Sequence, residues 1–366
     1  MGVDAGADRY ARQRALEGFG LDAQERLATA HAVVIGAGGL GSAVLPALAA
    51  AGLGTITVID GDRVEASNLH RQTLYGAADV GRWKVEAAAD ALRRIAPDVE
   101  LRERAVRFDA RNAPELLAGA DLLIDGGDTS ATRYIADDAA AARGIPLVWG
   151  AALRWVGEVG VAWEAHGVGY RDLHPEDVEA VDESCEIAGV LPTVCGIVGS
   201  LMATEALKLL TGTGEPLVGR ALLVDARAGT VRELRFRRDP AAPARSASPR
   251  PASAGHDATQ TGSESLRPSE LAALLATDPP ILLDVREPDE VARVALPGAT
   301  AIPLGALELR LDELDRRADL VVYCHHGVRS ARALATLRAA GFTRSRHLAG
   351  GIDAYAVEVD PTLPRY

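Results

Sequence analysis

The sequence has 366 residues, 48% of them hydrophobic, and a formal net charge of −12. This length predicts two domains. The acidic charge argues against nucleic acid as the main partner, because no basic surface field would attract it. Three cysteines are too few for a disulfide framework and indicate a reducing compartment. The first residues lack the apolar core of a signal peptide, so we expect a cytosolic protein.

The first predicted element covers residues 8–29, whose apolar side chains are spaced among three arginines as in an amphipathic helix. Residues 33–62 then predict a strand, a glycine turn, a helix to about Ala51 and a second strand ending at Asp60. Such a βαβ unit can hold a nucleotide, because glycines let the backbone approach phosphates and a helix N-terminus offers free N–H groups. An acid at the end of the second strand can accept ribose hydroxyls. The candidate residues are Gly36, Gly38, Gly39, Gly41 and Asp60.

This unit by itself permits two other interpretations. Enzymes that use NAD or FAD are the commonest owners of a G-x-G-x-x-G turn followed by an acid, so an oxidoreductase is the first alternative. Residues 32–59 carry no charge and are long enough for a membrane span, which is the second. Six glycines and Pro46 divide that stretch into strand-sized and helix-sized pieces, so we expect a buried unit and no membrane partner.

Polar residues follow this unit in an arrangement that favours phosphate chemistry. The loop at 62–74 is rich in side-chain donors, residues 83–95 predict a helix with Lys84 at its start, and a predicted strand at 121–125 precedes Asp128. Arginine and lysine neutralise the charge of a transferring phosphate, and a carboxylate anchors Mg²⁺. This set suits nucleoside triphosphate chemistry better than hydride transfer. Its members are Asp60, Asp62, Asn68, Arg71, Gln72, Lys84 and Asp128.

The remaining sequence predicts two domains separated by a linker. The first domain covers residues 8–238 and contains an aperiodic segment at 164–190. Residues 239–265 are rich in proline, alanine and serine, cannot bury a core and predict a flexible linker. Residues 266–366 predict a small α/β domain. We therefore expect an α/β protein with a Rossmann-like nucleotide-binding domain of mostly parallel sheet, followed by the smaller domain.

The second domain contains a compact cysteine loop, CHHGVRS (324–330), between a predicted strand and a predicted helix. The N–H groups of such a loop point at the cysteine sulfur and favour a thiolate. Four residues separate Cys324 from Arg329, and this small ring fits a persulfide better than a phosphate. The loop resembles that of the rhodanese sulfurtransferases, as do DVRE (284–287) and GGIDAY (350–355). The resemblance implies that Cys324 and Arg329 are catalytic and that thiosulfate or a cysteine desulfurase donates the sulfur.

The first domain resembles the ubiquitin-activating-enzyme-like adenylyltransferases of the MoeB/ThiF type, over about residues 8–238. The resemblance implies that ATP and Mg²⁺ activate the C-terminal carboxylate of a ubiquitin-like sulfur-carrier protein that ends in Gly-Gly, similar to MoaD, ThiS or CysO. The matching stretches are RYARQ (9–13), GAGGLGS (36–42), DGDRVEASNLHRQTL (60–74), GRWKVEAA (81–88), DGGDTSATR (125–133) and SCEIAGV (184–190).

The same resemblance implies roles for individual residues. Asp60 would hold the ribose, Asp128 would bind Mg²⁺, and Arg12 would reach the ATP of a partner subunit, which implies a homodimer. Cys185 matches a cysteine that forms an acyl disulfide or thioester with the carrier in relatives, and its alternative is an inert loop thiol. We expect Cys195, in an apolar helix, to serve core packing. The triphosphate would be held by Gly38, Gly39, Asn68, Arg71, Gln72 and Lys84.

One departure from the family pattern concerns zinc. Many relatives carry two C-x-x-C pairs, which would fall near residues 169–172 and just after Arg238, and neither pair is present here. The actinobacterial MoeZ branch, which the segment YRDL-P (170–175) resembles, also lacks these cysteines. The spacing of His166, Asp172 and His174 fits no standard site. We therefore predict no zinc site.

The two resemblances together predict a two-step enzyme. The first domain would form an acyl-adenylate on the carrier, and a persulfide on Cys324 would attack it and displace AMP. The alternatives are an NAD oxidoreductase with a regulatory, redox-sensing rhodanese module, and a non-catalytic scaffold that binds the carrier. The sequence does not identify the pathway, which could be that of molybdopterin, thiamine, cysteine, tRNA or a secondary metabolite.

Overall fold

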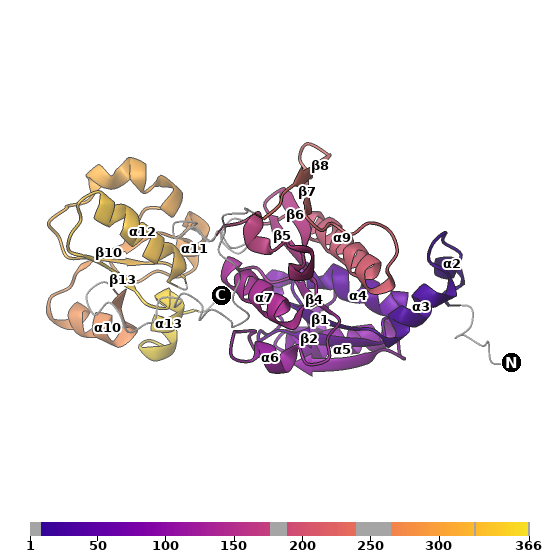
Figure 1. The fold of residues 1–366 in the computed structure, drawn as a ribbon. Coiled ribbons are helices and arrows are strands. Elements are labelled where there is room, and N and C mark those ends of the chain that lie inside the picture. The colour runs from indigo at the N-terminus through magenta and orange to yellow at the C-terminus, as the bar shows by residue number, and fades with distance from the viewer. Residues whose placement is uncertain (1–8, 176–188, 239–264, 326, 365–366) are drawn as a thin grey trace. The chain divides into compact units, whose positions relative to one another are not determined.

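The structure is a computed structural model, and it describes residues 9–175, 189–238, 265–325 and 327–364. The chain divides into two compact units, Met1–Gly255 and His256–Tyr366, each of which is described by itself below (Figure 1). Cys185 and all of the expected linker except Ser265 lie outside the described residues.

The first unit is built on a sheet of eight described strands in the order β3-β2-β1-β4-β5-β6-β7-β8. Neighbours from β3 to β5 pair in parallel, and those from β5 to β8 pair antiparallel. This confirms the predicted α/β class with a mostly parallel nucleotide-binding half. The strands are β1 (His31–Ile35), β2 (Thr55–Ile59), β3 (Glu100–Arg104), β4 (Leu122–Asp125), β5 (Leu147–Leu153), β6 (Val156–Ala162), β7 (Arg220–Asp225) and β8 (Thr230–Arg235).

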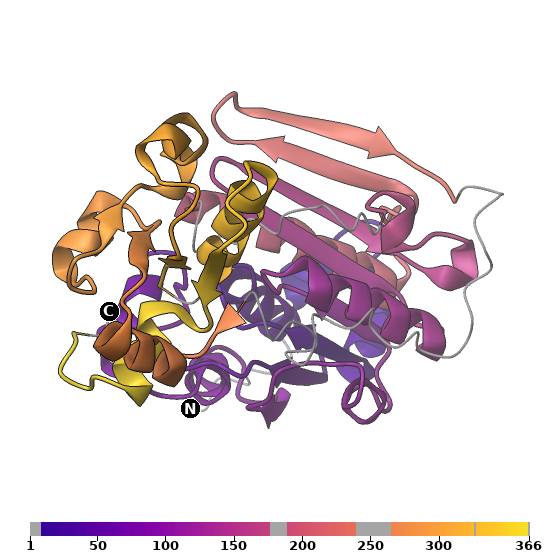
Figure 2. The ribbon, with the colours of Figure 1, turned by 90° about the vertical axis from the view of Figure 1, so that its left-hand side faces the viewer.

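Helices cover both faces of this sheet, and β1 shows how its side chains divide between them. Ala32 and Val34 join the core under α3, α4, α5 and α9, whereas Val33 and Ile35 join the core under α6 and α7 (Figures 1 and 2). Because both faces are buried, the inner parallel strands β1 and β4 are buried along their whole length, without alternation. The helices are α2 (Ala11–Arg14), α3 (Gly20–Thr29), α4 (Gly41–Ala51), α5 (Lys84–Ile95), α6 (Ala113–Leu116), α7 (Ser130–Arg143) and α9 (Pro192–Thr211), with short 3₁₀ turns at Ala66–Asn68, Ala77–Asp79, Glu164–His166 and Tyr170–Asp172.

One prediction about elements is corrected. The single helix expected over residues 8–29 is two helices, α2 and α3, because Gly18 and Gly20 adopt positive φ angles of 78° and 68° between them. The uncharged stretch 32–59 forms β1, α4 and β2 inside the unit, which confirms the buried unit that its glycines and Pro46 predicted in place of a membrane span. The helix α9 is long and apolar enough to pass a membrane-span test, but it packs on α4, β5 and β6.

The second unit is the predicted small α/β fold, with five described parallel strands in the order β11-β10-β12-β13-β9. The helices α10 and α13 pack on one face, and α12 packs on the other. Cys324 directly follows β12, and α12 begins at Val328. The elements are β9 (Ser265–Leu266), α10 (Pro268–Thr277), β10 (Ile281–Asp284), α11 (Pro288–Arg293), β11 (Thr300–Ala301), β12 (Leu320–Tyr323), α12 (Val328–Ala339), β13 (Ser345–Leu348) and α13 (Gly351–Glu358), with 3₁₀ turns at Leu304–Ala306 and Glu308–Glu313.

Candidate functional site

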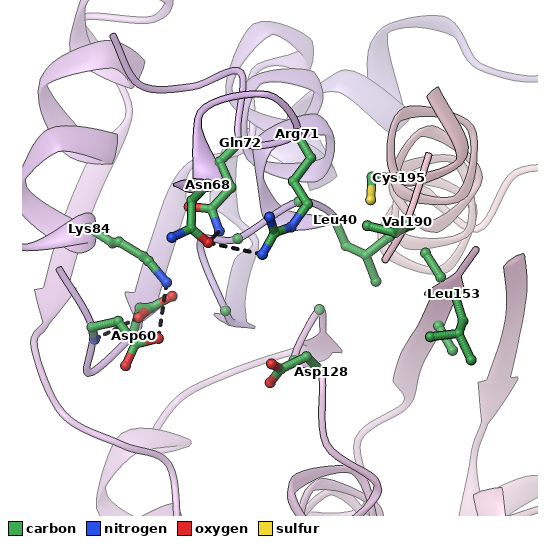
Figure 3. A pocket seen from close by; sticks show the side chains of 18 of the residues that line it. Leu40, Asp60, Asn68, Arg71, Gln72, Lys84, Asp128, Leu153, Val190 and Cys195 are labelled. Carbon is green, nitrogen blue, oxygen red and sulfur yellow. Dashed lines mark hydrogen bonds and ion pairs between the residues drawn. The ribbon is translucent and has the colours of Figure 1, made fainter. Parts of the chain in front are cut away.

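A pocket of about 260 Å³ lies beyond the carboxyl ends of the parallel strands in the first unit (Figure 3). The loops after β1, β2 and β4 and the end of β5 form its walls. In an open α/β sheet this is the edge where ligands bind. Its lining consists of Gly36, Gly38, Gly39, Leu40, Asp60, Asp62, Asn68, Arg71, Gln72, Lys84, Gly126, Gly127, Asp128, Ser130, Arg133, Ala151, Ala152, Leu153, Val190 and Cys195.

Glycines let two backbone loops approach each other at the base of the pocket. Gly36 has a φ of +87°, and a Cβ there would lie 2.8 Å from the carbonyl oxygen of Gly126. A Cβ on Gly41 would lie 2.2 Å from the carbonyl oxygen of Gly36. These two positions therefore demand glycine for packing, and Gly36 lines the pocket together with Gly38 and Gly39.

The Asp60 carboxylate fixes the loop after β1 to the loop after β2. Its Oδ2 accepts a hydrogen bond from the backbone N–H of Ala37 at 2.8 Å, and its Oδ1 accepts one from that of Asp62 at 2.8 Å. Burial raises the pKa of Asp60, while nearby Lys84 and the two N–H groups oppose the shift. Each oxygen keeps a second lone pair for another donor, such as a ribose hydroxyl.

Cationic and amide side chains gather along one wall of the pocket. Lys84 is nearly buried, with 8% of its side chain exposed, and its Nζ lies 3.0 Å from Oδ2 of Asp62. Oδ1 of Asn68 accepts hydrogen bonds from Nη2 of Arg71 at 2.9 Å and from Nε2 of Gln72 at 3.1 Å. Asn68 thereby orients both donors beside the glycine loop (Figure 3).

The Asp128 carboxylate stands on the wall opposite these donors (Figure 3). Among the residues that the structure describes, no hydrogen bond or ion pair engages it. The far end of the pocket is apolar, formed by Ala151, Ala152, Leu153 and Val190. The pocket thus joins a polar, cationic end to a small apolar end.

The structure brings most of the predicted site residues together. All of the nucleotide-site candidates except Gly41 and Arg12 line the pocket, and Gly41 begins α4 beside it. Arg12 lies exposed on α2 and is not part of the lining. Cys195 packs in the core as expected, but it also lines the pocket. Cys185 lies outside the described residues.

Sequence reasoning missed Arg133 and the apolar end of the pocket. Arg133 lies in the stretch 125–133, which carried the family resemblance, so its place in the motif was the available signal. The apolar end comes from β5 and from Val190, where nothing in the local pattern marks a ligand contact.

The cysteine loop of the second unit surrounds its sulfur with donors. Sγ of Cys324 accepts hydrogen bonds from the backbone N–H of Gly327 at 3.2 Å and from that of Ser330 at 3.4 Å. The Cys324 thiol donates to Oγ of Ser330 at 3.7 Å, and that hydroxyl donates to the carbonyl oxygen of Gly327 at 3.0 Å. Cys324 is 1% exposed and stands before the N-terminus of α12. The two N–H groups stabilise a negative charge on the sulfur.

Arg329 makes a bidentate ion pair with Glu290 of α11, and both N–O distances are 2.6 Å. Burial raises the pKa of Glu290, but Arg329 and the N–H of Glu287 lower it more, to about 2. The sequence predicted Arg329 but not its partner, which is 39 residues away.

The region in which the sequence lacks the two C-x-x-C pairs holds an arginine ion pair. Arg238 binds both oxygens of Glu164, at 2.7 and 2.6 Å, and its Nε lies 3.6 Å from Oδ1 of Asp172. The ring of His166 lies tilted against that of Trp163, with 4.2 Å between their centroids, and Nε2 of His174 lies 3.2 Å from Glu158. Within the described part of the chain, no group of three His, Cys, Asp or Glu side chains is arranged to hold a metal ion.

The fold and the two sites define a nucleotide-binding α/β enzyme joined to a cysteine-loop unit. Residues 10–244 match the ThiF family, and residues 267–358 match the rhodanese-like domain. The chain therefore belongs to the ThiF family and carries a C-terminal rhodanese-like domain, which confirms the resemblance found in the sequence. Curated relatives that match nearly the whole chain are named adenylyltransferase and sulfurtransferase, so this chain is an enzyme of that kind, and these relationships give no support to the oxidoreductase interpretation.

Two of the curated relatives match nearly the whole chain, and a third matches 64% of it. The chain is 41% identical to the "Probable adenylyltransferase/sulfurtransferase MoeZ" of Mycobacterium tuberculosis, covering 98% of this chain and 95% of the relative. It is 35% identical to the "Adenylyltransferase and sulfurtransferase MOCS3-1" of Zea mays, covering 98% and 83%. It is 46% identical to the "Sulfur carrier protein adenylyltransferase" of Thermus thermophilus, covering 64% and 89%.

Solved structures show the likeness of the fold. A crystal structure of E. coli MccB with ATP is 21% identical, with a TM-score of 0.56 over 66% of this chain and 75% of that one. A structure of PaaA is 24% identical, with a TM-score of 0.54 over 64% and 75%.

Proposed function

We propose that the first unit adenylates the C-terminal carboxylate of a ubiquitin-like sulfur carrier ending in Gly-Gly, and that the second unit transfers sulfur to it from a Cys324 persulfide. The observation that carries the proposal is the pocket, in which Lys84 and Arg71 face Asp128 across a space that continues into an apolar end. A carrier is the substrate named for the Thermus relative.

The polar end suits ATP. Asp60 would accept the ribose hydroxyls, and the N–H groups of Gly38 and Gly39 would meet the phosphates at the start of α4. Arg71 and Lys84 would offset the repulsion between an attacking carboxylate and the α-phosphate. Asn68 and Gln72 would add uncharged donors beside them, and Asp62 would hold Lys84 in place.

Mg²⁺ fits the same end, because this ion is commonly bound by one or two protein carboxylates together with substrate phosphates. Asp128 is a pocket carboxylate that no described side chain neutralises, so it would be the protein ligand. The ion would neutralise phosphate charge and help pyrophosphate to leave.

The apolar end suits the tail of the carrier. Ala151 and Ala152 present small side chains there, beside Leu153 and Val190. A Gly-Gly tail lacks side chains and can run through such a space in an extended form. Its terminal carboxylate would then lie between Asp128 and the cationic wall, where the α-phosphate is expected.

The proposed reaction has three steps. A carboxylate oxygen attacks the α-phosphorus, pyrophosphate leaves, and an acyl-adenylate forms. The terminal sulfur of the Cys324 persulfide attacks the carbonyl carbon and AMP leaves, which gives an acyl disulfide. A thiolate, for which Cys185 is the candidate, attacks Sγ of Cys324; the carrier thiocarboxylate leaves and a protein disulfide remains, which a cellular thiol reduces.

The loop around Cys324 would prepare the persulfide for this attack. The N–H groups of Gly327 and Ser330 would stabilise its negative charge, and Glu290 would hold Arg329 at the loop. Thiosulfate and the persulfide of a cysteine desulfurase are the two donors that we propose. A reducing cytosol would keep Cys324 available for loading.

We also propose a homodimer. Arg12 lies exposed on α2, away from the pocket of its own chain, so it is available to reach the pocket of a second copy. The absence of a zinc ligand set remains a prediction, because the residues after Arg238 lie outside the described part.

The test is the intact mass of a Gly-Gly carrier after incubation with this protein, Mg-ATP and thiosulfate. We expect a shift equal to one oxygen replaced by sulfur, no shift with Arg71→Ala, and adenylate without sulfur with Cys324→Ala. A mass unchanged for every carrier, together with no Mg-ATP binding, would overturn the proposal.

A further inference from the structure

Both backbone polar groups of Ala37, in the middle of the glycine loop, are held by side chains. Its N–H donates to Asp60 at 2.8 Å, and its carbonyl oxygen accepts a hydrogen bond from the Tyr75 hydroxyl at 2.7 Å. Tyr75 follows the polar loop that supplies Asn68, Arg71 and Gln72, and it does not line the pocket. Its hydroxyl therefore ties the polar loop to the glycine loop from below the site.

The bond to Ala37 sets the direction of the next N–H group. The Ala37 carbonyl and the Gly38 N–H belong to one trans peptide, so they point in opposite directions. The following carbonyl, of Gly38, is occupied by the N–H of Ser42 at 2.9 Å. Among the described residues nothing accepts a hydrogen bond from the Gly38 N–H, and Gly38 lines the pocket. This N–H is therefore available to a ligand, and the Tyr75 hydroxyl fixes the plane that aims it.

The surroundings of Tyr75 make its hydroxyl a constant donor. The ring is 7% exposed and packs in the core with residues of α4 and α5. Burial raises the pKa of Tyr75, so the hydroxyl keeps its proton at every pH where the protein works. The carbonyl oxygen of Lys84 lies 3.3 Å from the same hydroxyl, which places Tyr75 between the glycine loop and the start of α5.

We propose that Tyr75 is a positioning residue of the nucleotide site: its hydroxyl holds the Ala37–Gly38 peptide so that the Gly38 N–H faces a phosphate of the nucleotide. This rests on the proposed assignment of the pocket to ATP. Tyr75 therefore supports the binding of the phosphate chain, and the binding of the adenosine part of the nucleotide does not depend on it.

Tyr75→Phe tests this role because it removes only the hydroxyl and keeps the buried ring. Tyr134→Phe is the matched control: its hydroxyl also donates to backbone carbonyls, of His174 and Pro175 at 3.3 and 3.2 Å, outside the pocket lining. Binding of Mg-ATP and of adenosine would be measured by calorimetry on the full chain, beside kcat and KM for ATP in pyrophosphate exchange.

We expect Tyr75→Phe to weaken Mg-ATP binding about fivefold, as the loss of one buried hydrogen bond predicts. KM for ATP should rise with kcat nearly unchanged, because the bond acts in ground state and transition state alike. Tyr75→Phe should bind adenosine as tightly as the wild type does. Tyr134→Phe should leave the affinities for both Mg-ATP and adenosine unchanged.

The outcomes separate this inference from the function on which it rests. If the wild type does not bind Mg-ATP, both are overturned. If the wild type binds and Tyr75→Phe binds equally well, or loses adenosine and Mg-ATP in equal proportion, the positioning role alone is overturned. If Tyr75→Phe does not fold, Tyr75→His and Tyr75→Leu are compared instead. The histidine variant has a ring donor and must bind Mg-ATP more tightly than the leucine variant does. Equal affinities for Mg-ATP would contradict the proposal.

Discussion

Nε of Arg133 lies 3.6 Å from Oδ2 of Asp125, and both side chains are almost fully buried beneath the loop that carries Asp128. Oδ1 of Asp125 accepts the N–H of Gly127 at 2.8 Å, and Nη2 of Arg133 donates to the Gly127 carbonyl at 3.1 Å. Both backbone polar groups of Gly127, the residue before Asp128, are thus hydrogen-bonded to side chains. This arrangement fixes the second loop of the pocket as Asp60 and Tyr75 fix the first.

Replacing Arg133 by Met should therefore destabilise the first unit. The substitution leaves Asp125 buried without its cation, and breaking a buried pair costs roughly 3 kcal/mol of unfolding free energy. Arg133→Met with Asp125→Asn should recover part of that loss, because no uncompensated charge remains. Urea unfolding of the single and double variants measures both effects. A double variant no more stable than Arg133→Met would contradict the pairing.

The ion pair between Glu290 and Arg329 should give the second unit an acid-dependent stability. The pKa of Glu290 is about 2 in the folded chain and 4.5 ordinarily. Because the folded value is the lower, the stabilisation is present above pH 4.5 and is lost as the pH falls toward 2. Glu290→Gln should flatten this dependence in thermal unfolding, whereas Glu308→Gln, at an exposed glutamate, should not. Parallel pH profiles for the wild type and Glu290→Gln would refute the assignment.

Arg238 and Glu164 supply a test of the predicted absence of zinc. Their side chains are 26% and 27% exposed, so the pair should contribute about 1 kcal/mol to stability. Arg238→Met and Glu164→Gln should each lower the free energy of unfolding by about this amount, and the double variant by no more than either.

Treatment with EDTA should leave the Tm of the wild type unchanged. A fall in Tm that added zinc reverses would show a metal site instead.

The sequence predicted the nucleotide half of the site because its signals are local. The glycine loop, Asp60 and the residues from Asn68 to Lys84 lie on one βαβ unit and the loop after it, where spacing alone places them at one edge of a sheet. The strand β3, with sequence ELRER, gave no such signal, since it is polar and only partly buried at the edge of the sheet.

The contacts that hold the sites together could not be predicted in the same way. Arg329 meets Glu290 across 39 residues, and Arg238 meets Glu164 across 74. The tie between Tyr75 and Ala37 spans 38 residues. Such pairs depend on how separate elements pack. The sequence shows that a residue is charged, but it does not show whether that side chain is exposed to solvent or paired in the fold.

The segment joining the two units should matter for the coupled reaction and for neither half alone. Residues 239–265, which the sequence predicts to be a linker, would span roughly 30 Å as a coil. We propose that this segment lets Cys324 approach a bound adenylate. Deleting residues 239–264 should leave pyrophosphate exchange and the transfer of sulfur from thiosulfate to cyanide unchanged, because each needs one unit. Formation of the carrier thiocarboxylate should fall by at least about tenfold, because a tether too short to span the two sites loses the effective concentration of the tethered step. A Gly-Ser segment of equal length should restore it, and a deletion variant that forms thiocarboxylate at the wild-type rate would show that the segment plays no part in sulfur delivery.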